Sequence, residues 1–178
     1  VGFYESLYAY GNIVLCTTTG ATGIRRPYHA IGNIVYNSTA GTATGILMDT
    51  ATMIHQSLNN IVAGFSGAGG KGISVSNQVL HGFNAYYNNA TNSSVSDQKW
   101  VDLTANDVAL GADPFTDAAN GDFSLTAAAQ TALADKGFPI AYYGAHANTV
   151  SNLNIGPIQN DAGGTSGVIR RVMRLLGG

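Results

Sequence analysis

The chain has 178 residues, of which 10% are charged, and its formal net charge is −2. A typical globular domain carries about 25% charged residues. This chain has a single glutamate and three lysines, the residue types from which solvated helices are built, and their scarcity argues against a helical bundle. The hydrophobic fraction of 45% is enough for the core of one domain. The small net charge predicts no attraction to nucleic acid. The apolar runs are short and interrupted, which predicts no membrane insertion.

Two short motifs recur in a fixed order through the first 90 residues. The first is a glycine followed by an apolar residue and a strand-like run, found at Gly2, Gly23, Gly45 and Gly72. The second is an asparagine that opens another such run, found at Asn12, Asn33, Asn60 and Asn84. Both recur every 21 to 27 residues, and the runs are rich in Ile, Val, Tyr and Thr, which predicts the coils of a parallel β-solenoid.

The two recurring residue types have structural roles in such a coil. Glycine permits a bend with positive φ, so that the apolar residue after it points into the core. Asparagine tolerates the left-handed conformation, and its amide can bond to neighbouring backbone. We therefore expect the asparagines of stacked coils to form a ladder along the solenoid axis.

Several segments resemble one known family. Gly-Asn-Ile-Val-Tyr-Asn at 32–37 and Asn-Asn-Ile-Val at 59–62 resemble the repeated coil of the right-handed parallel β-helix proteins, often called pectate-lyase-like. Segments 112–117, 120–125, 137–139 and 154–159 resemble the region that ends many bacterial and phage β-helices. The resemblance implies an all-β, right-handed parallel β-helix of about four coils; it implies no single function, because lyases, hydrolases, adhesins and phage tail proteins share this architecture.

The chain divides into three parts. Residues 1–90 are the predicted coils, residues 91–160 an irregular closing region of the same domain, and residues 161–178 a Gly-rich linker with a short basic tail. One short helix is predicted at Ala127–Lys136, and the closing region is expected to cover the open end of the solenoid. Because the sequence starts at Val1 in the middle of a repeat, we expect it to be a piece of a longer polypeptide.

The tail is a different kind of sequence from the coils. On a helix, Val168, Val172, Leu175 and Leu176 would lie near one face and the arginines on the other. Its candidate assembly contacts are Val168, Arg170, Arg171, Val172, Arg174 and Leu175. The alternatives are a solvated terminus, a peptide that docks on another subunit or another part of a large assembly, and, more weakly, membrane attachment.

The coils are poor in carboxylates. Enzymes resembling pectate lyases hold Ca²⁺ with aspartates, and those resembling polygalacturonases use clustered aspartates as acid and base. The acids of residues 1–90 are Glu5 and Asp49, which occupy different phases of the repeat, so no catalytic pair is predicted there. Arg25 and Arg26 lie one coil after Glu5, which predicts an ion pair between stacked coils or, alternatively, contact with an acidic sugar.

Other candidate ligands lack a regular arrangement. His29, His55 and His81 stand at different offsets from the predicted ladder, so no metal site and no cofactor are predicted from them. The aspartates between residues 97 and 135 are expected to cap turns, with bound Ca²⁺ as a weaker alternative. The tyrosines of the coils are expected to pack in the core, or else to form a carbohydrate platform.

These patterns predict a non-catalytic structural component of an extracellular or virion assembly, such as a tail spike, fibre or surface appendage. The expected partners are further copies or other subunits, with polysaccharide as an additional partner. Two alternatives stay open: the C-terminal half of a secreted polysaccharide lyase or glycoside hydrolase with its active site upstream, and a glycan-binding surface adhesin.

Overall fold

The computed structural model describes residues 3–4, 8–50, 54–76, 79–96, 99–138, 155–156, 159–160, 166–167 and 172–174. These residues are nearly all β, with one α-helix and two 3₁₀ turns. The helix has seven residues, and in the described part of the chain no helix has the length and apolarity that crossing a bilayer requires.

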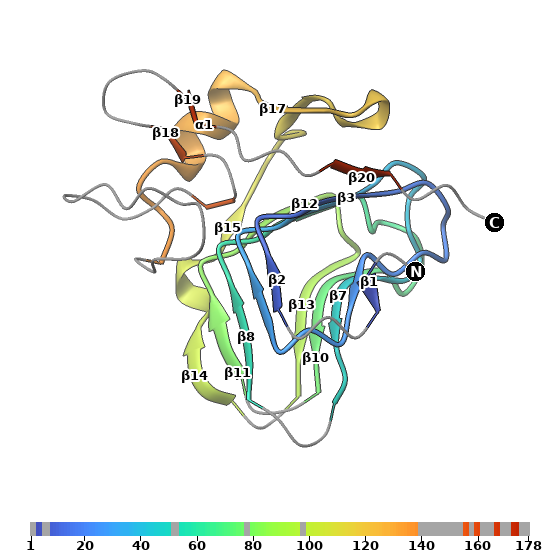
Figure 1. The fold of residues 1–178 in the computed structure, drawn as a ribbon, viewed down its shortest axis with the longest axis vertical. Helices are drawn as coiled ribbons and strands as arrows, with labels where there is room; N and C mark the ends of the chain where they lie inside the picture. The colour runs from blue at the N-terminus through green and yellow to red at the C-terminus, as the bar shows by residue number, and fades with distance from the viewer. Residues whose placement is uncertain are drawn as a thin grey trace.

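Three parallel sheets run side by side along the molecule (Figure 1). Sheet A contains β1 (Phe3–Tyr4), β4 (Ile24–Arg25), β7 (Thr44–Met48), β10 (Lys71–Val75) and β13 (Thr91–Val95). Sheet B contains β2 (Tyr8–Tyr10), β5 (His29–Ile31), β8 (His55–Leu58), β11 (Val79–Gly82) and β14 (Lys99–Leu103). Sheet C contains β20 (Val172–Arg174), β3 (Ile13–Cys16), β6 (Ile34–Asn37), β9 (Ile61–Ala63), β12 (Ala85–Tyr87) and β15 (Val108–Ala109).

From β1 to β15 the chain visits sheets A, B and C in turn. Each strand pairs in parallel with the strand at the same place in the next coil, so that Ile24 is aligned with Ile46 and Ile46 with Ile73. The predicted parallel β-solenoid of about four turns is therefore confirmed.

The lumen of the solenoid is a column of apolar side chains. Because alternate residues of a strand point to opposite faces, each strand sends one set of side chains inward. Ile24, Ile46 and Ile73 from sheet A meet Val14 and Val35 from sheet C there, and all five are fully buried. Each such side chain contributes about 1.5–3 kcal/mol to folding by leaving water.

The glycines before the sheet A isoleucines do not take positive φ, so the expected reason for them is wrong. Their role is to leave space between coils. A Cβ on Gly23 would overlap Cγ1 of Val35 and lie 2.7 Å from the carbonyl oxygen of Gly45, and a Cβ on Gly45 would lie 2.7 Å from the carbonyl oxygen of Gly72. Gly2 lies outside the described residues.

The left-handed positions stand one residue before the ladder asparagines rather than at them. These positions are Gly11, Gly32, Asn59 and Phe83, with φ between 56° and 65°. Here the chain turns sharply out of sheet B and into sheet C. Glycine and asparagine enter this conformation more easily than phenylalanine does.

The coils continue beyond residue 90, where the sequence markers end. Strands β13, β14 and β15 form a fifth set, each paired in parallel with the preceding coil. Its register places Ser93 in the column of Ile73 and Val108 beside Ala85. This fifth coil does not match the sequence motif, because polar residues stand where the earlier coils have the glycine and isoleucine of the repeat.

The region after the coils packs on the outer face of sheet C. A hairpin of β16 (Phe115–Asp117) and β17 (Asp122–Leu125) encloses the 3₁₀ turn η2 (Ala118–Asn120) and is followed by α1 (Ala127–Leu133). Figure 1 shows β17 and α1 together on the side of the solenoid occupied by sheet C. The described part of this region thus covers a flank of the solenoid, and cover of its open end by the region stays a prediction.

A second apolar core fills this interface. Ile34 and Ile61 point outward from sheet C and pack with Phe115, Phe123 and Leu133. The two phenylalanine rings meet edge to face with centroids 5.3 Å apart.

Helix α1 has an N-terminal cap, because the Thr126 hydroxyl accepts a hydrogen bond from Ala129 N at 3.3 Å. The helix ends at Leu133, three residues before the predicted end.

The tail contains strands rather than a helix where it is described. Strand β19 (Ser166–Gly167) pairs antiparallel with β18 (Gln159–Asn160), which lies at the end of the closing region. Strand β20 then returns to the other end of the chain and adds to β3 in parallel, aligning Val172 with Ile13 and Arg174 with Leu15.

Candidate functional site

The four predicted ladder asparagines form one continuous chain of hydrogen bonds. The backbone N and side-chain Nδ2 of Asn12 both donate to Oδ1 of Asn33, each at 3.0 Å. Asn33 donates in the same way to Asn60 at 3.0 and 2.9 Å, and Asn60 to Asn84 at 3.0 and 2.9 Å. Each amide oxygen therefore fixes the entry of the preceding coil into sheet C.

The amides of Asn33, Asn60 and Asn84 also hold a carbonyl group one coil earlier. These bonds run from Nδ2 of Asn33 to Ala9 O, from Nδ2 of Asn60 to Ala30 O, and from Nδ2 of Asn84 to Ser57 O, at 2.8, 2.8 and 3.0 Å. The polar atoms of these fully buried amides are thus paired, as burial requires.

An aspartate ends the ladder. Oδ1 of Asp107 accepts a hydrogen bond from Asn84 N at 2.8 Å, which is the acceptor role that asparagine has in the coils before it. The backbone N–H of Asp107 donates to Thr104 O at 3.0 Å and so closes the 3₁₀ turn η1 (Thr104–Asn106). The sequence does carry a signal for this position, because Asn106-Asp107-Val108 parallels Asn59-Asn60-Ile61.

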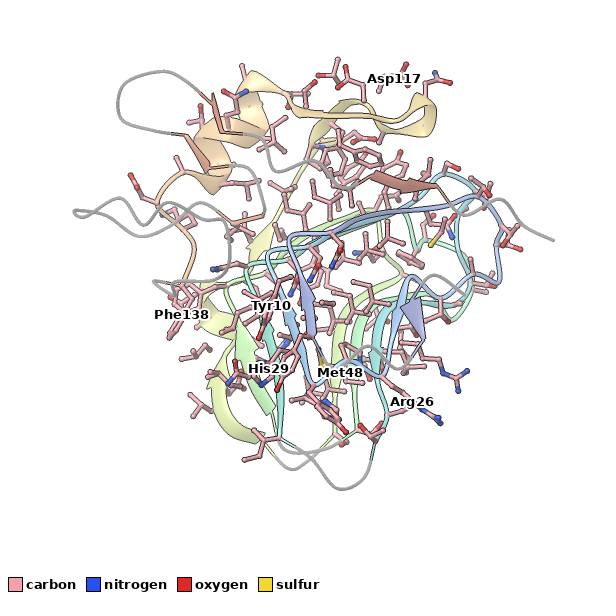
Figure 2. All side chains as sticks on the ribbon, in the orientation of Figure 1. Tyr10, Arg26, His29, Met48, Asp117 and Phe138 are labelled. Atoms are coloured by element: carbon pink, nitrogen blue, oxygen red, sulfur yellow. The ribbon has the colours of Figure 1, made fainter. Side chains whose placement is uncertain are left out.

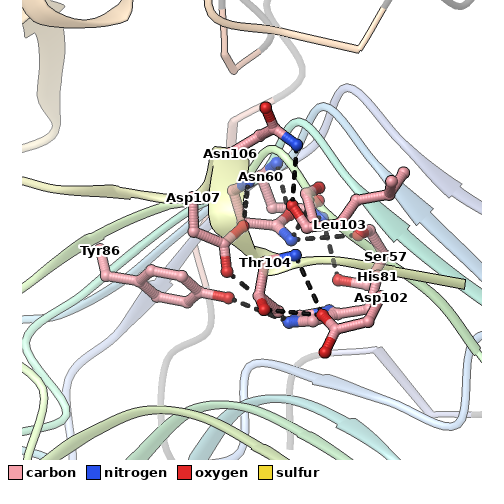
Figure 3. A network of polar contacts seen from close by, with 11 residues as sticks. Ser57, Asn60, His81, Tyr86, Asp102, Leu103, Thr104, Asn106 and Asp107 are labelled. Atoms are coloured by element: carbon pink, nitrogen blue, oxygen red, sulfur yellow. Dashed lines mark hydrogen bonds and ion pairs between the residues drawn. The ribbon is translucent and has the colours of Figure 1, made fainter. Parts of the chain in front are cut away.

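A polar cluster surrounds Asp107 at this end of the lumen (Figure 3). The imidazole of His81 is only 1% exposed, and its Nε2 lies 3.4 Å from the Tyr86 hydroxyl and 3.9 Å from Oδ2 of Asp107. The Asp107 side chain is 14% exposed, so it stands between the buried network and solvent. Sequence reasoning did not find this cluster, since its members lie in β11, in β12 and between η1 and β15.

The environment of Asp107 favours its neutral form. Burial raises the pKa of the Asp107 carboxyl to about 6, against the lowering effect of the Asn84 N–H, and the charge of Asp102 adds to the rise. Burial also raises the pKa of the Tyr86 phenol well above its ordinary value. The cluster can therefore gain or lose one proton near neutral pH while Tyr86 stays protonated.

Asp102 is the carboxylate whose charge acts on Asp107. Asp102 is exposed, and its Oδ1 accepts hydrogen bonds from Thr104 N at 3.1 Å and from Thr104 Oγ1 at 2.6 Å, which hold the η1 turn. Throughout the described residues no three His, Cys, Asp or Glu side chains stand close enough to share a metal ion.

The two arginines of the candidate ion pair meet an aspartate of the next coil. Nε of Arg26 lies 2.8 Å from Oδ1 of Asp49, and Nη2 of Arg25 lies 3.8 Å from Oδ2 of the same carboxylate. Glu5, the partner expected from the sequence, lies outside the described residues. The pairs are partly exposed, so their contribution to stability is small.

An aromatic group forms on the outer face of sheet B. Figure 2 shows Tyr10 beside His29, and the Tyr10 hydroxyl lies 2.8 Å from His29 Nδ1. The ring of Tyr8 meets that of His29 edge to face, with centroids 5.1 Å apart, and Tyr8 is 56% exposed. Burial, aided by the nearby His55, lowers the pKa of His29, which favours a neutral ring in this group.

The three histidines of the coils do not align with one another across the coils, and each has different neighbours. His29 is aligned with Gln56, His55 with Val79 and His81 with Ser57. His55 is fully buried, and its Nδ1 lies 2.9 Å from Pro27 O.

The aspartates of the closing region act in turns. Oδ1 of Asp113 accepts from Phe115 N and Oδ1 of Asp122 accepts from Ser124 N, both at 3.0 Å. Asp113 also accepts from the Tyr36 hydroxyl at 3.1 Å. Burial and the Asp113 charge raise the pKa of Tyr36 to about 12.

The candidate assembly contacts of the tail fall mostly outside the description. Val172 and Arg174 lie in β20, whereas Val168, Arg170, Arg171 and Leu175 are outside the described residues.

Comparison of the chain with protein-family models, with curated protein sequences and with solved structures yields no match. The finding that stands is the parallel β-solenoid itself, and the resemblance to the pectate-lyase-like family remains an expectation from the sequence.

Proposed function

We propose that the chain is a non-catalytic structural component of an extracellular or virion assembly, of the kind found in tail spikes, fibres and surface appendages. The observation that carries the proposal is the asparagine ladder. It runs through the solenoid from Asn12 to Asp107, and its buried amides are engaged in holding one coil to the next.

The charges of the coils support the same proposal. Asp49 is held by Arg25 and Arg26, and Asp107, which feels the charge of Asp102, lies at the end of the lumen. Hydrolysis or elimination on a sugar chain needs carboxylates or a metal exposed on one face. A stack of coils locked by buried amides and an apolar lumen instead fits a rigid spacer that joins other parts.

The test measures assembly and turnover separately. Sedimentation of the purified chain over a range of concentrations, with electron microscopy of negatively stained samples, should show assemblies larger than a monomer. Incubation with acidic polysaccharides should release neither unsaturated products, followed by ultraviolet absorbance, nor new reducing ends. A chain that stays monomeric at all concentrations contradicts the structural role, and turnover contradicts its non-catalytic part.

A second candidate, glycan binding by a surface adhesin, is favoured by the aromatic group of sheet B. An exposed tyrosine ring whose neighbours fix its orientation offers an apolar plane with a polar rim, on which a sugar ring can stack. If Tyr8 has this role, Tyr8→Ala should abolish retardation of the protein in gels that contain the bound polysaccharide. Tyr28→Ala, a change at a half-buried tyrosine outside the group, should leave retardation unchanged.

A further inference from the structure

The two ends of the asparagine ladder are chemically different. At the last coil, Asp107 accepts from Asn84 and satisfies its own backbone N–H within the η1 turn, so no hydrogen-bond donor of the ladder is left pointing outward. At the first coil, Asn12 donates twice to Asn33, and within the described residues nothing donates to Asn12 Oδ1. The end formed by β1, β2 and β3 is therefore the end at which the hydrogen-bond pattern can continue.

The structure already places an added strand at this end. Strand β20 pairs with the outer edge of β3 in parallel, with Val172, Met173 and Arg174 aligned to Ile13, Val14 and Leu15. It continues sheet C in the direction and register of the coils. Strands β1 and β2 remain the outermost members of sheets A and B in the described chain.

The pairing of β20 with β3 does not depend on which copy of the chain supplies β20. The bonds of a parallel ladder are made by backbone groups, so they are the same for a strand from the same chain and for one from a neighbour. The sequence before β20 contains Gly163 and Gly164, a composition typical of linkers. Exchange of such an element between copies leaves the number of contacts unchanged.

We propose that β20 of one copy adds to β3 of a second copy and so joins the copies head to tail. This inference rests on the proposed structural function, of which it names the joint. The contact is heterologous, because the edge of β3 on one copy meets the tail of the next, so it generates a closed ring or an open filament according to the rotation between copies. The partner is thus a second copy of this chain, recognised by the backbone pairing that β20 makes with β3.

Two chains with one cysteine each can test the exchange. In a Cys16→Ala background, one tagged chain carries Leu15→Cys and a second, differently tagged chain carries Arg174→Cys; these positions are aligned in the pairing of β3 with β20. After the chains are mixed, refolded together and oxidised, a disulfide between the two tags forms above the level of random collision only if the tail of one chain lies on the other. A second pair, Ile13→Cys with Val172→Cys, repeats the test if the first variant does not fold.

The expected result is a covalent heterodimer on a non-reducing gel. Its yield should be about tenfold above that of a control in which Gly178→Cys replaces Arg174→Cys, because pairing on β3 raises the effective concentration of the two thiols. A yield equal to that of the control overturns the exchange. A third chain that carries both Leu15→Cys and Arg174→Cys overturns it as well if its disulfide forms only within one chain. If the wild-type chain still assembles in sedimentation, that result removes the joint alone; if it stays monomeric, the proposed function fails as well.

Discussion

Replacing Asp107 by asparagine should stabilise the protein. In the preceding coils an asparagine at this position accepts from the coil before it and gives its Nδ2 hydrogen to a carbonyl one coil earlier, as Asn84 does to Ser57 O. The register Ser57–His81 identifies the corresponding carbonyl for residue 107 as that of His81. An asparagine would keep the bond from Asn84 N, add the missing donor and remove a buried charge.

The size of the effect follows from the raised pKa of Asp107. The pKa is about 6 in the folded protein against an ordinary value of 3.8, so between these two values the folded state binds the proton more tightly than the unfolded state. Stability therefore falls as pH rises through this window, by up to about 3 kcal/mol at 1.36 kcal/mol for each pKa unit. Because the side chain has some solvent contact, we expect Asp107→Asn to raise the free energy of unfolding by about 1–3 kcal/mol at pH 8.

Urea unfolding, followed by circular dichroism at pH 4 and pH 8, measures this difference. The gain should be present at pH 8 and much smaller at pH 4, where the carboxyl is protonated in the folded state. Asp122→Asn is the matched control, since Asp122 is exposed in β17, and it should change little at either pH. A variant that is less stable than wild type at pH 8, or a gain that does not depend on pH, would refute the reasoning.

Three further outcomes are expected. Gly45→Ala should lower the free energy of unfolding by about 2 kcal/mol or more, because its Cβ would lie 2.7 Å from a carbonyl oxygen of the next coil, whereas Gly20→Ala, with open space around it, should not; thermal melts compare the two. Asn60→Ala should cost about 2–4 kcal/mol in urea unfolding by leaving two buried donors of the preceding coil unpaired, while Asn92→Ala on the surface should cost under about 1 kcal/mol. Alkaline difference spectra of wild type and Tyr36→Phe should place the Tyr36 phenol at a pKa of about 12, and a value near 10 would contradict the contact with its carboxylate partner.

The repeat could be found in the sequence because the fold demands one residue type at one register position. A ladder position needs a side chain that accepts from one coil and donates to another, and asparagine does both with a short side chain. The same logic explains why the fifth coil was missed. At the ladder position of the fifth coil only the hydrogen-bond acceptor is used, so Asp107 can take the place of an asparagine. Because the residue type changes there, the position does not match the asparagine motif.

The covering of sheet C could have been anticipated from its strands. Ile13-Val14, Ile34-Val35 and Ile61-Val62 are runs of adjacent apolar residues, which indicate a strand buried on both faces. What the sequence does not specify is which later segment supplies the cover. That depends on the packing of distant rings, such as Phe115 against Tyr36 with centroids 5.8 Å apart.

The placement of the β16–β17 hairpin and α1 on sheet C has a consequence for the order of folding. Coil-to-coil contacts join residues 21 to 27 positions apart, as in the Asn12–Asn33 and Asn33–Asn60 bonds, so each coil can form on the one before it as the chain emerges during synthesis. The contact of Tyr36 with Asp113 spans 77 positions and must come later. A nascent solenoid therefore presents the isoleucines of sheet C to water until α1 is complete, and that interval is when the chain is most exposed to aggregation.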